Sequence, residues 1–114
     1  MVANPTPDLL VGPSGVCQAP VCETVDITLA DFSIVPARID VHAPRVRFVL
    51  TNAGSFTHAL EIRANGGDNR SLNIGPGETG FLDVELPPGE YQVVCPIAGH
   101  ALRGQRATIE FRLP

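Results

Sequence analysis

The sequence predicts an all-β protein, folded as an antiparallel sandwich or barrel. From residue 24 onward, apolar and polar residues alternate in short runs, which is the period of a strand with one buried face. Glycine, proline and other turn residues interrupt these runs at short intervals, as is typical of sandwiches and barrels. No segment shows helical periodicity over about ten residues or more.

Each expected strand carries its inward-facing residues at alternate positions. In chain order these are Val25, Ile27 and Leu29 in residues 24–32; Ile39 and Val41 in residues 37–43; Val46, Phe48 and Leu50 in residues 45–52; His58, Leu60 and Ile62 in residues 57–63; Leu82, Val84 and Leu86 in residues 79–86; Tyr91, Val93 and Cys95 in residues 89–95; and Ala107, Ile109 and Phe111 in residues 106–113. Residues 64–78 are expected to be mostly loop around one short strand.

The chain of 114 residues is long enough for one domain with a single core. Residues 1–23 are rich in proline, glycine and small residues, and we interpret them as an irregular N-terminal extension. Residues 24–114 form the expected domain.

The composition excludes several classes of function. The net charge is −4 and no basic stripe is present, which disfavours a nucleic-acid surface. No apolar run approaches the roughly 20 residues that cross a bilayer. The first residues, MVANPTPDLL, lack the basic and apolar regions of a secretory signal. The chain is therefore either cytoplasmic or the mature form of an exported protein.

Three residues with metal-binding side chains are expected to meet at one end of the domain. Cys95 ends a strand on the inward face, His58 begins another strand on its inward face, and His100 lies in the loop after Cys95. One thiolate with two imidazoles suits a copper ion that has a weak fourth ligand. Zinc would bind the same set but prefers four strong ligands. The third histidine, His42, is expected at a strand end without a chemical role.

Two segments, RIDVHAPRVRFVLTNAGSFTHALEI and LPPGEYQVVCPIAGHALRGQRATIEF, resemble the cupredoxin family of small blue copper proteins. The second contains a Gly-x-Tyr strand leading to cysteine, a proline-containing loop and Gly-His. The resemblance implies a Greek-key β-sandwich of about seven or eight strands. It also implies a monomeric one-electron carrier whose single copper ion is held by His58, Cys95 and His100.

The chain departs from the family pattern at the axial position. The family usually has methionine where this chain has Gln105, and the one methionine here is Met1. In this respect the chain resembles the stellacyanin-like members, in which glutamine is the axial ligand. An amide oxygen is a harder donor than a thioether, so it favours Cu(II) and predicts a lower reduction potential. The alternative is an axial position that is empty or filled by a backbone carbonyl near Thr57. Strand alternation directs Gln92 away from Cys95.

A second departure is Ala59, where the family often has an asparagine that ties the two ligand loops together. Asn52 or Ser55 could take over this role.

If Cys95 is a metal ligand, Cys17 and Cys22 remain as a pair. They are close enough in sequence for a short disulfide loop, which would indicate an oxidising compartment such as the periplasm or the extracellular space. The alternatives to a disulfide are that Cys17 and Cys22 form a second metal or redox pair, or that they remain reduced in a cytoplasmic protein.

The surface around His100 is the expected docking site for redox partner proteins. An apolar patch surrounds this histidine, and it consists of Pro96, Ile97, Ala98, Ala101 and Leu102. Arg103 and Arg106 lie next to the patch in sequence and would favour an acidic partner, unless they are ordinary solvated charges. Two other functions remain open: a copper enzyme or sensor with an open coordination position, and a sandwich that binds other molecules or carries copper without redox chemistry.

Overall fold

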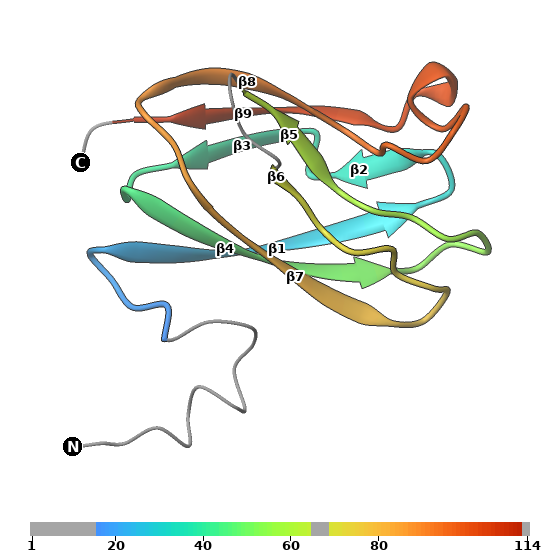
Figure 1. Ribbon diagram of the computed structural model, residues 1–114, viewed down its shortest axis with the longest axis horizontal. Coiled ribbons are helices and arrows are strands. Elements are labelled where there is room, and N and C mark those ends of the chain that lie inside the picture. The colour runs from blue at the N-terminus through green and yellow to red at the C-terminus, as the bar shows by residue number, and fades with distance from the viewer. Residues whose placement is uncertain (1–15, 65–68, 113–114) are drawn as a thin grey trace.

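The computed structural model describes residues 16–64 and 69–112, and it contains two β-sheets that face each other (Figure 1). The first sheet has the strand order β2-β1-β4-β7 and the second the order β3-β9-β8-β5-β6. The strands are β1 (Cys22–Ala30), β2 (Ser33–Val35), β3 (Arg38–Val41), β4 (Arg45–Asn52), β5 (Glu61–Arg63), β6 (Asn69–Arg70), β7 (Thr79–Glu85), β8 (Gly89–Val94) and β9 (Arg106–Phe111). The predicted β-sandwich is confirmed.

The sheets are mixed, whereas the sequence predicted antiparallel pairing throughout. β1 pairs in parallel with β4, and β3 pairs in parallel with β9. The remaining pairings between strands are antiparallel. The parallel pairs arise because the chain leaves the first sheet after β2, forms β3 in the second sheet and returns at β4. Alternation of apolar residues reports which face of a strand is buried, and it carries no information about strand direction.

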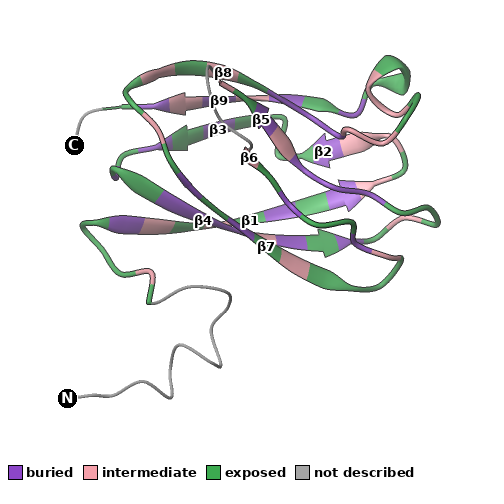
Figure 2. Cartoon of the chain, in the orientation of Figure 1, coloured by how far each residue is buried: buried purple, intermediate pink, exposed green. Residues whose placement is uncertain are grey.

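One core lies between the sheets, and it is built from the predicted inward positions. Buried residues alternate with exposed ones along β3 and mainly with half-buried ones along β9 (Figure 2). The fully buried side chains include Ile27, Leu29, Phe48, Leu50, Ile62 and Ile109. Val25, Leu86 and Tyr91 are only partly buried and pack against the edge of this core. Burial of aliphatic and aromatic side chains contributes about 1.5–3 kcal/mol each and holds the two sheets together.

The predicted strand at residues 57–63 is shorter in the structure. β5 contains only Glu61–Arg63, and His58 instead forms an isolated bridge with Ile74. The His58 N–H donates to the Ile74 carbonyl at 3.0 Å, and the Ile74 N–H donates to the His58 carbonyl at 2.8 Å. This bridge fixes the backbone of His58 at the end of the sandwich.

The only helix among the described residues is the single 3₁₀ turn η1 (Ala101–Arg103). None of them forms a helix with the length and apolar character needed to cross a membrane. Figure 1 places η1 and the turn between β1 and β2 at one end of the sandwich, and the start of β1 at the other.

The predicted disulfide between Cys17 and Cys22 is present, with 5.0 Å between the two Cα atoms. It joins the residues before β1 to the first residue of that strand. Cys95 is the only free cysteine, and it is buried.

Candidate metal centre

Three side chains converge at the end of the sandwich that carries η1. The donor atoms of His58, Cys95 and His100 all lie within 4.8 Å of one another. Cys95 Sγ is 4.0 Å from His58 Nδ1 and 3.6 Å from His100 Nδ1. Cys95 and His58 are buried, while His100 is partly exposed. The structure thus brings together the three candidate metal ligands that the sequence singled out.

The loop from Cys95 to Gln105 is closed by hydrogen bonds between its own backbone groups. The Cys95 N–H donates to the Gln105 carbonyl at 3.1 Å, which brings the two ends of the loop side by side. The Gln105 N–H donates to the His100 carbonyl at 3.1 Å. Gly104 adopts a φ of 108°, a left-handed conformation that glycine accepts without the penalty of a Cβ atom. Local backbone structure therefore brings Cys95, His100 and Gln105 close together.

The side chain of Gln105 is fully buried, and its oxygen lacks a hydrogen bond. Its Nε2 donates to the Ala30 carbonyl at 2.7 Å and to the Ser33 carbonyl at 3.0 Å. Only the amide nitrogen can donate to carbonyl oxygens, so this contact assigns the orientation of the carboxamide. Oε1 is the one buried side-chain polar atom in the described part of the chain without a hydrogen-bond partner. Such an atom costs about 1–3 kcal/mol unless another group, such as a cation, contacts it.

A carboxylate that the sequence analysis did not identify contacts His58. Asp31 Oδ1 lies 2.7 Å from His58 Nε2. The pKa of Asp31 is lowered, first by the hydrogen bond from the Ser55 N–H and also by those from His58 and Phe56. An ionised carboxylate only accepts hydrogen bonds, so His58 Nε2 carries the proton. In the neutral ring the lone pair of His58 then lies on Nδ1, the nitrogen that faces Cys95.

The imidazole ring of His100 makes edge contacts with two aromatic rings. Its ring centroid is 5.1 Å from that of Phe32 and 6.2 Å from that of Phe56. Burial of the imidazole, and then the charge of the neighbouring His58, lower the pKa of His100, while the side chain of Gln105, which interacts with the ring without reaching hydrogen-bond geometry, raises it. The neutral form, which has a lone pair for a metal, is therefore favoured at neutral pH.

Asn52 joins the loop before His58 to the segment at Ile74, and its side-chain hydrogen bonds do not reach the Cys95–Gln105 loop, so it does not link the two ligand loops as the sequence analysis suggested for Asn52 or Ser55. Its Nδ2 donates to the carbonyls of Phe56 and Ile74, both at 2.8 Å, and its Oδ1 accepts from the Gly54 N–H at 2.8 Å. Ala59 is buried and has no side-chain polar group for this role.

The other residues singled out by the sequence lie near the surface. The residues of the apolar patch around His100 range from half-buried to exposed, and Leu102 is 86% exposed. In the structure, two further apolar side chains contact His100: Phe56, which is 53% exposed, and the half-buried Phe32. His42 is exposed and lies outside the cluster. Periodicity could not identify Asp31, Phe32 or Phe56, because their contacts join segments distant in sequence.

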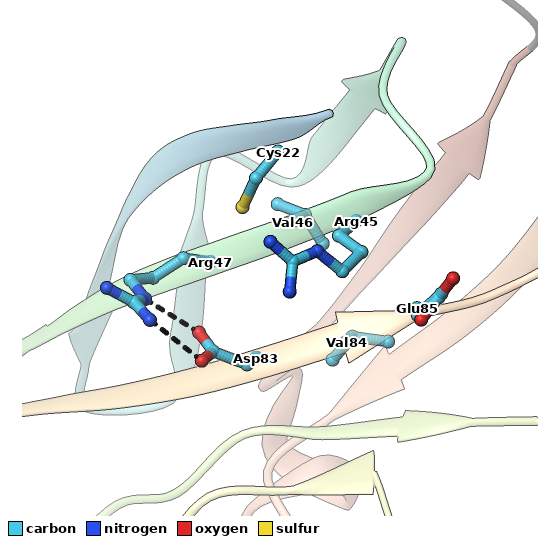
Figure 3. Close-up of a pocket in the computed structure, with 7 residues that line it drawn as sticks. All are labelled: Cys22, Arg45, Val46, Arg47, Asp83, Val84 and Glu85. Carbon is cyan, nitrogen blue, oxygen red and sulfur yellow. Dashed lines mark hydrogen bonds and ion pairs between the residues drawn. The ribbon is translucent and has the colours of Figure 1, made fainter. Parts of the chain in front are cut away.

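A groove of about 210 Å³ lies elsewhere on the molecule, beside the start of β1 (Figure 3). Arg47 and Asp83 meet there in a two-pronged ion pair, with Nε–Oδ1 at 2.8 Å and Nη2–Oδ2 at 3.0 Å. Arg47 is buried although its position in β4 predicts an outward side chain. None of His58, Cys95 and His100 lines this groove.

Comparisons with known proteins identify the family and agree with the fold. Residues 16–107 match the model of the cupredoxin-like domain family. No curated protein matches the chain. Among solved structures, auracyanin B has a TM-score of 0.69 at 20% identity, with 89% of this chain and 96% of that chain covered. The dithionite-reduced auracyanin of Roseiflexus castenholzii has a TM-score of 0.71 at 15% identity, with 81% and 98% covered. A multicopper oxidase has a TM-score of 0.66 at 16% identity, and the match covers 90% of this chain and 46% of the oxidase.

Proposed function

The chain belongs to the cupredoxin-like domain family, and we propose that it is a blue copper protein that carries one electron at a time between redox partners. Its single copper ion would be held by His58, Cys95 and His100, with Gln105 Oε1 as the axial ligand. The observation that carries this proposal is the buried thiol with two imidazole nitrogens, all within 4.8 Å of one another, together with the buried amide oxygen of Gln105, which lacks a hydrogen bond.

The chemistry of these donors favours copper over zinc. One thiolate, two imidazoles and one weak ligand are the set typical of blue copper sites. A structural zinc site usually has four strong ligands, and an amide oxygen is a weak one. When bound, copper would supply a one-electron couple between Cu(II) and Cu(I).

The protein's own contribution is to hold the donors in one arrangement. Cys95 and Gln105 are joined by a backbone hydrogen bond, and His58 is fixed by its bridge to Ile74. The neutral ring of His100 and the Nε2–H form of His58 both leave a lone pair for the metal. Donors that are already buried and bonded have little freedom to rearrange, which is the property that fast electron transfer needs.

The partially exposed His100 is the proposed point of electron entry and exit. The apolar patch of Pro96, Ile97, Ala98, Ala101 and Leu102 would form the docking surface, enlarged by Phe32 and Phe56. Arg103 lies over the Phe32 ring, with Cζ 4.9 Å from its centroid, and Arg106 is exposed nearby. Weak electron-transfer complexes use small interfaces, and these two cations favour an acidic partner.

The Cys17–Cys22 disulfide supports a place outside the cytoplasm, in the periplasm or the extracellular space, because disulfides persist in oxidising compartments. Free thiols at both positions in protein purified from its native cells under alkylating conditions would contradict this assignment.

The test is titration of the metal-free protein with Cu(II), followed by visible absorption and EPR. We expect one copper per chain and an intense thiolate-to-copper absorption band. The Cys95→Ser variant should lose this band, while His42→Ala, which changes an exposed histidine outside the cluster, should keep it. Weak absorption in the native chain would overturn the proposal. A spectrum that changes on addition of azide would instead favour an enzyme or sensor with an open coordination position.

A further inference from the structure

The turn between β1 and β2 contacts three of the four proposed donors within four consecutive residues. Ala30 ends β1 and Ser33 begins β2, so Asp31 and Phe32 form a two-residue connection. The backbone carbonyls of the flanking residues contact Gln105, the side chain of Asp31 contacts His58, and the ring of Phe32 contacts His100.

The carbonyls of this turn determine the orientation of the Gln105 carboxamide. Ala30 and Ser33 are a paired position of the β1–β2 ladder, so their carbonyl oxygens are held by the sheet. Both accept from Gln105 Nε2, at 2.7 Å and 3.0 Å. Because the nitrogen is directed to the turn, Oε1 is directed away from it and lies buried without a hydrogen bond. The turn therefore selects which end of the amide is available to a cation.

Asp31 determines which nitrogen of His58 carries the proton. Its Oδ1 accepts from Nε2 at 2.7 Å, and its Oδ2 accepts from the Ser55 N–H at 2.8 Å. The carboxylate is thus held by both the turn and the loop that precedes His58. A Cβ atom at Gly54 would overlap Asp31 Oδ1 and lie 2.9 Å from His58 Nε2, so glycine at this position leaves the space for the contact. A carboxylate bonded to a metal-binding histidine fixes the tautomer and strengthens the ligand.

Phe32 adopts a backbone conformation that a bulky residue rarely has. Its φ is 86°, in the left-handed region where glycine is favoured. In this conformation its ring lies 5.7 Å from Phe56 and 5.1 Å from His100, measured between centroids. Backbone strain of this kind persists where the surroundings hold it, and it is concentrated at functional sites.

We propose that the Ala30–Ser33 turn is a positioning element of the metal centre, in which Asp31 holds His58 with Nδ1 free and its negative charge stabilises the oxidised ion. This inference rests on the proposed function, since it assigns a metal to the cluster. Asp31 is a positioning residue and contacts no metal itself. Loss of such a partner typically weakens metal binding by about 10- to 100-fold.

The experiment compares Asp31→Ala and Asp31→Asn with Asp26→Asn. Asp26 is an exposed carboxylate of β1, the strand that leads into the turn, and lies roughly 16 Å from Asp31 along the chain, so its variant controls for the loss of one charge. NMR of the metal-free protein reports the His58 tautomer from its ring ¹⁵N shifts. Cu(II) affinity and the reduction potential are then measured for each variant.

The native chain and Asp26→Asn should show only the Nε2–H tautomer of His58. Asp31→Ala should show a mixture of tautomers and a Cu(II) affinity lower by about 10- to 100-fold. Asp31→Asn, which can still accept from Nε2–H, should recover the tautomer and show a higher potential than the native chain. An unchanged tautomer in Asp31→Ala, or an unchanged potential in Asp31→Asn, would overturn the inference.

The NMR result does not depend on copper, so it separates failure of this inference from failure of the proposed function. If Asp31→Ala does not fold, Asp31→Asn still gives the potential. Phe32→Gly provides a further check, since glycine accepts the positive φ while the ring is removed. That variant should retain the Nε2–H tautomer of His58, and loss of this tautomer would contradict the role assigned to Asp31.

Discussion

Gln105 illustrates how a single buried amide can define a metal site. Both contacts of its nitrogen are made to backbone carbonyls of one turn, and its oxygen is left without a hydrogen bond. A glutamine that served only the core would be expected to satisfy both ends of its amide, because an unsatisfied buried acceptor is costly. The geometry therefore supports the interpretation of Oε1 as a ligand atom.

Replacing Gln105 by methionine should raise the reduction potential of the copper-loaded protein. A thioether is a softer donor than an amide oxygen and favours Cu(I). The substitution also removes the hydrogen bonds to the Ala30 and Ser33 carbonyls, so the metal-free variant should lose about 1–3 kcal/mol in its free energy of unfolding. Protein-film voltammetry measures the potential, and urea denaturation measures the stability.

The matched control is Gln92→Met, which makes the same chemical change on the exposed face of β8. Its potential should equal that of the native chain. If Gln105→Met also leaves the potential unchanged, Gln105 does not act on the metal.

Some residues of the site could be predicted from the sequence because they are close together in it. Cys95, His100 and Gln105 belong to one loop, and His58 begins a recognisable apolar run. The contact between Asp31 and His58 joins residues 27 positions apart, across a connection between strands. Alternation of apolar residues determines which way a strand faces, but it does not determine which loop lies above a given histidine.

At the scale of the elements, strand positions were more predictable than strand pairing. The inward residues of β4 and β9 match the pattern of alternation, since each strand has one face on the core. The parallel pairs β1–β4 and β3–β9 depend on where the chain crosses between sheets, which involves contacts distant in sequence. Arg47 is buried through its ion pair with Asp83 on β7, which its place in the pattern of β4 could not indicate.

The disulfide at the start of β1 should stabilise this strand without affecting the metal centre. Cys17 and Cys22 are five positions apart, and closing so short a loop is expected to stabilise the fold by about 2 kcal/mol. The Cys17→Ser variant should therefore unfold at a lower urea concentration. Its copper absorption band should be unchanged, because β1 separates Cys22 from the site by about 26 Å.

Cys22→Ser is the companion variant and should show the same loss of stability. A changed absorption band in both variants would contradict the separation of the two ends. Unchanged stability in both would show that the bridge does not constrain the unfolded chain.

At the scale of the whole molecule, the hydrophobic core and the proposed donors occupy different parts of the sandwich. The core between the sheets includes residues of both, such as Leu50 of β4 and Ile109 of β9, and it contains none of the proposed donors. The proposed donors lie at one end, where the Cys95–Gln105 loop, the β1–β2 turn and the His58 bridge meet. This division predicts a site that is preformed in the metal-free protein.

We therefore expect the metal-free chain to be folded, with a β-rich circular dichroism spectrum and a cooperative thermal transition. Copper that binds only the native state should raise this transition, with a stabilisation of about 2.7 kcal/mol when free copper is 100 times the dissociation constant. The Cys95→Ala variant should fold as well, yet show a much smaller shift, because two imidazoles and an amide remain without the thiolate. An unfolded metal-free chain would mean that the metal contributes to forming the sandwich itself, as in small metal-dependent domains. A folded chain with no shift would instead mean that the cluster does not bind copper in the native state.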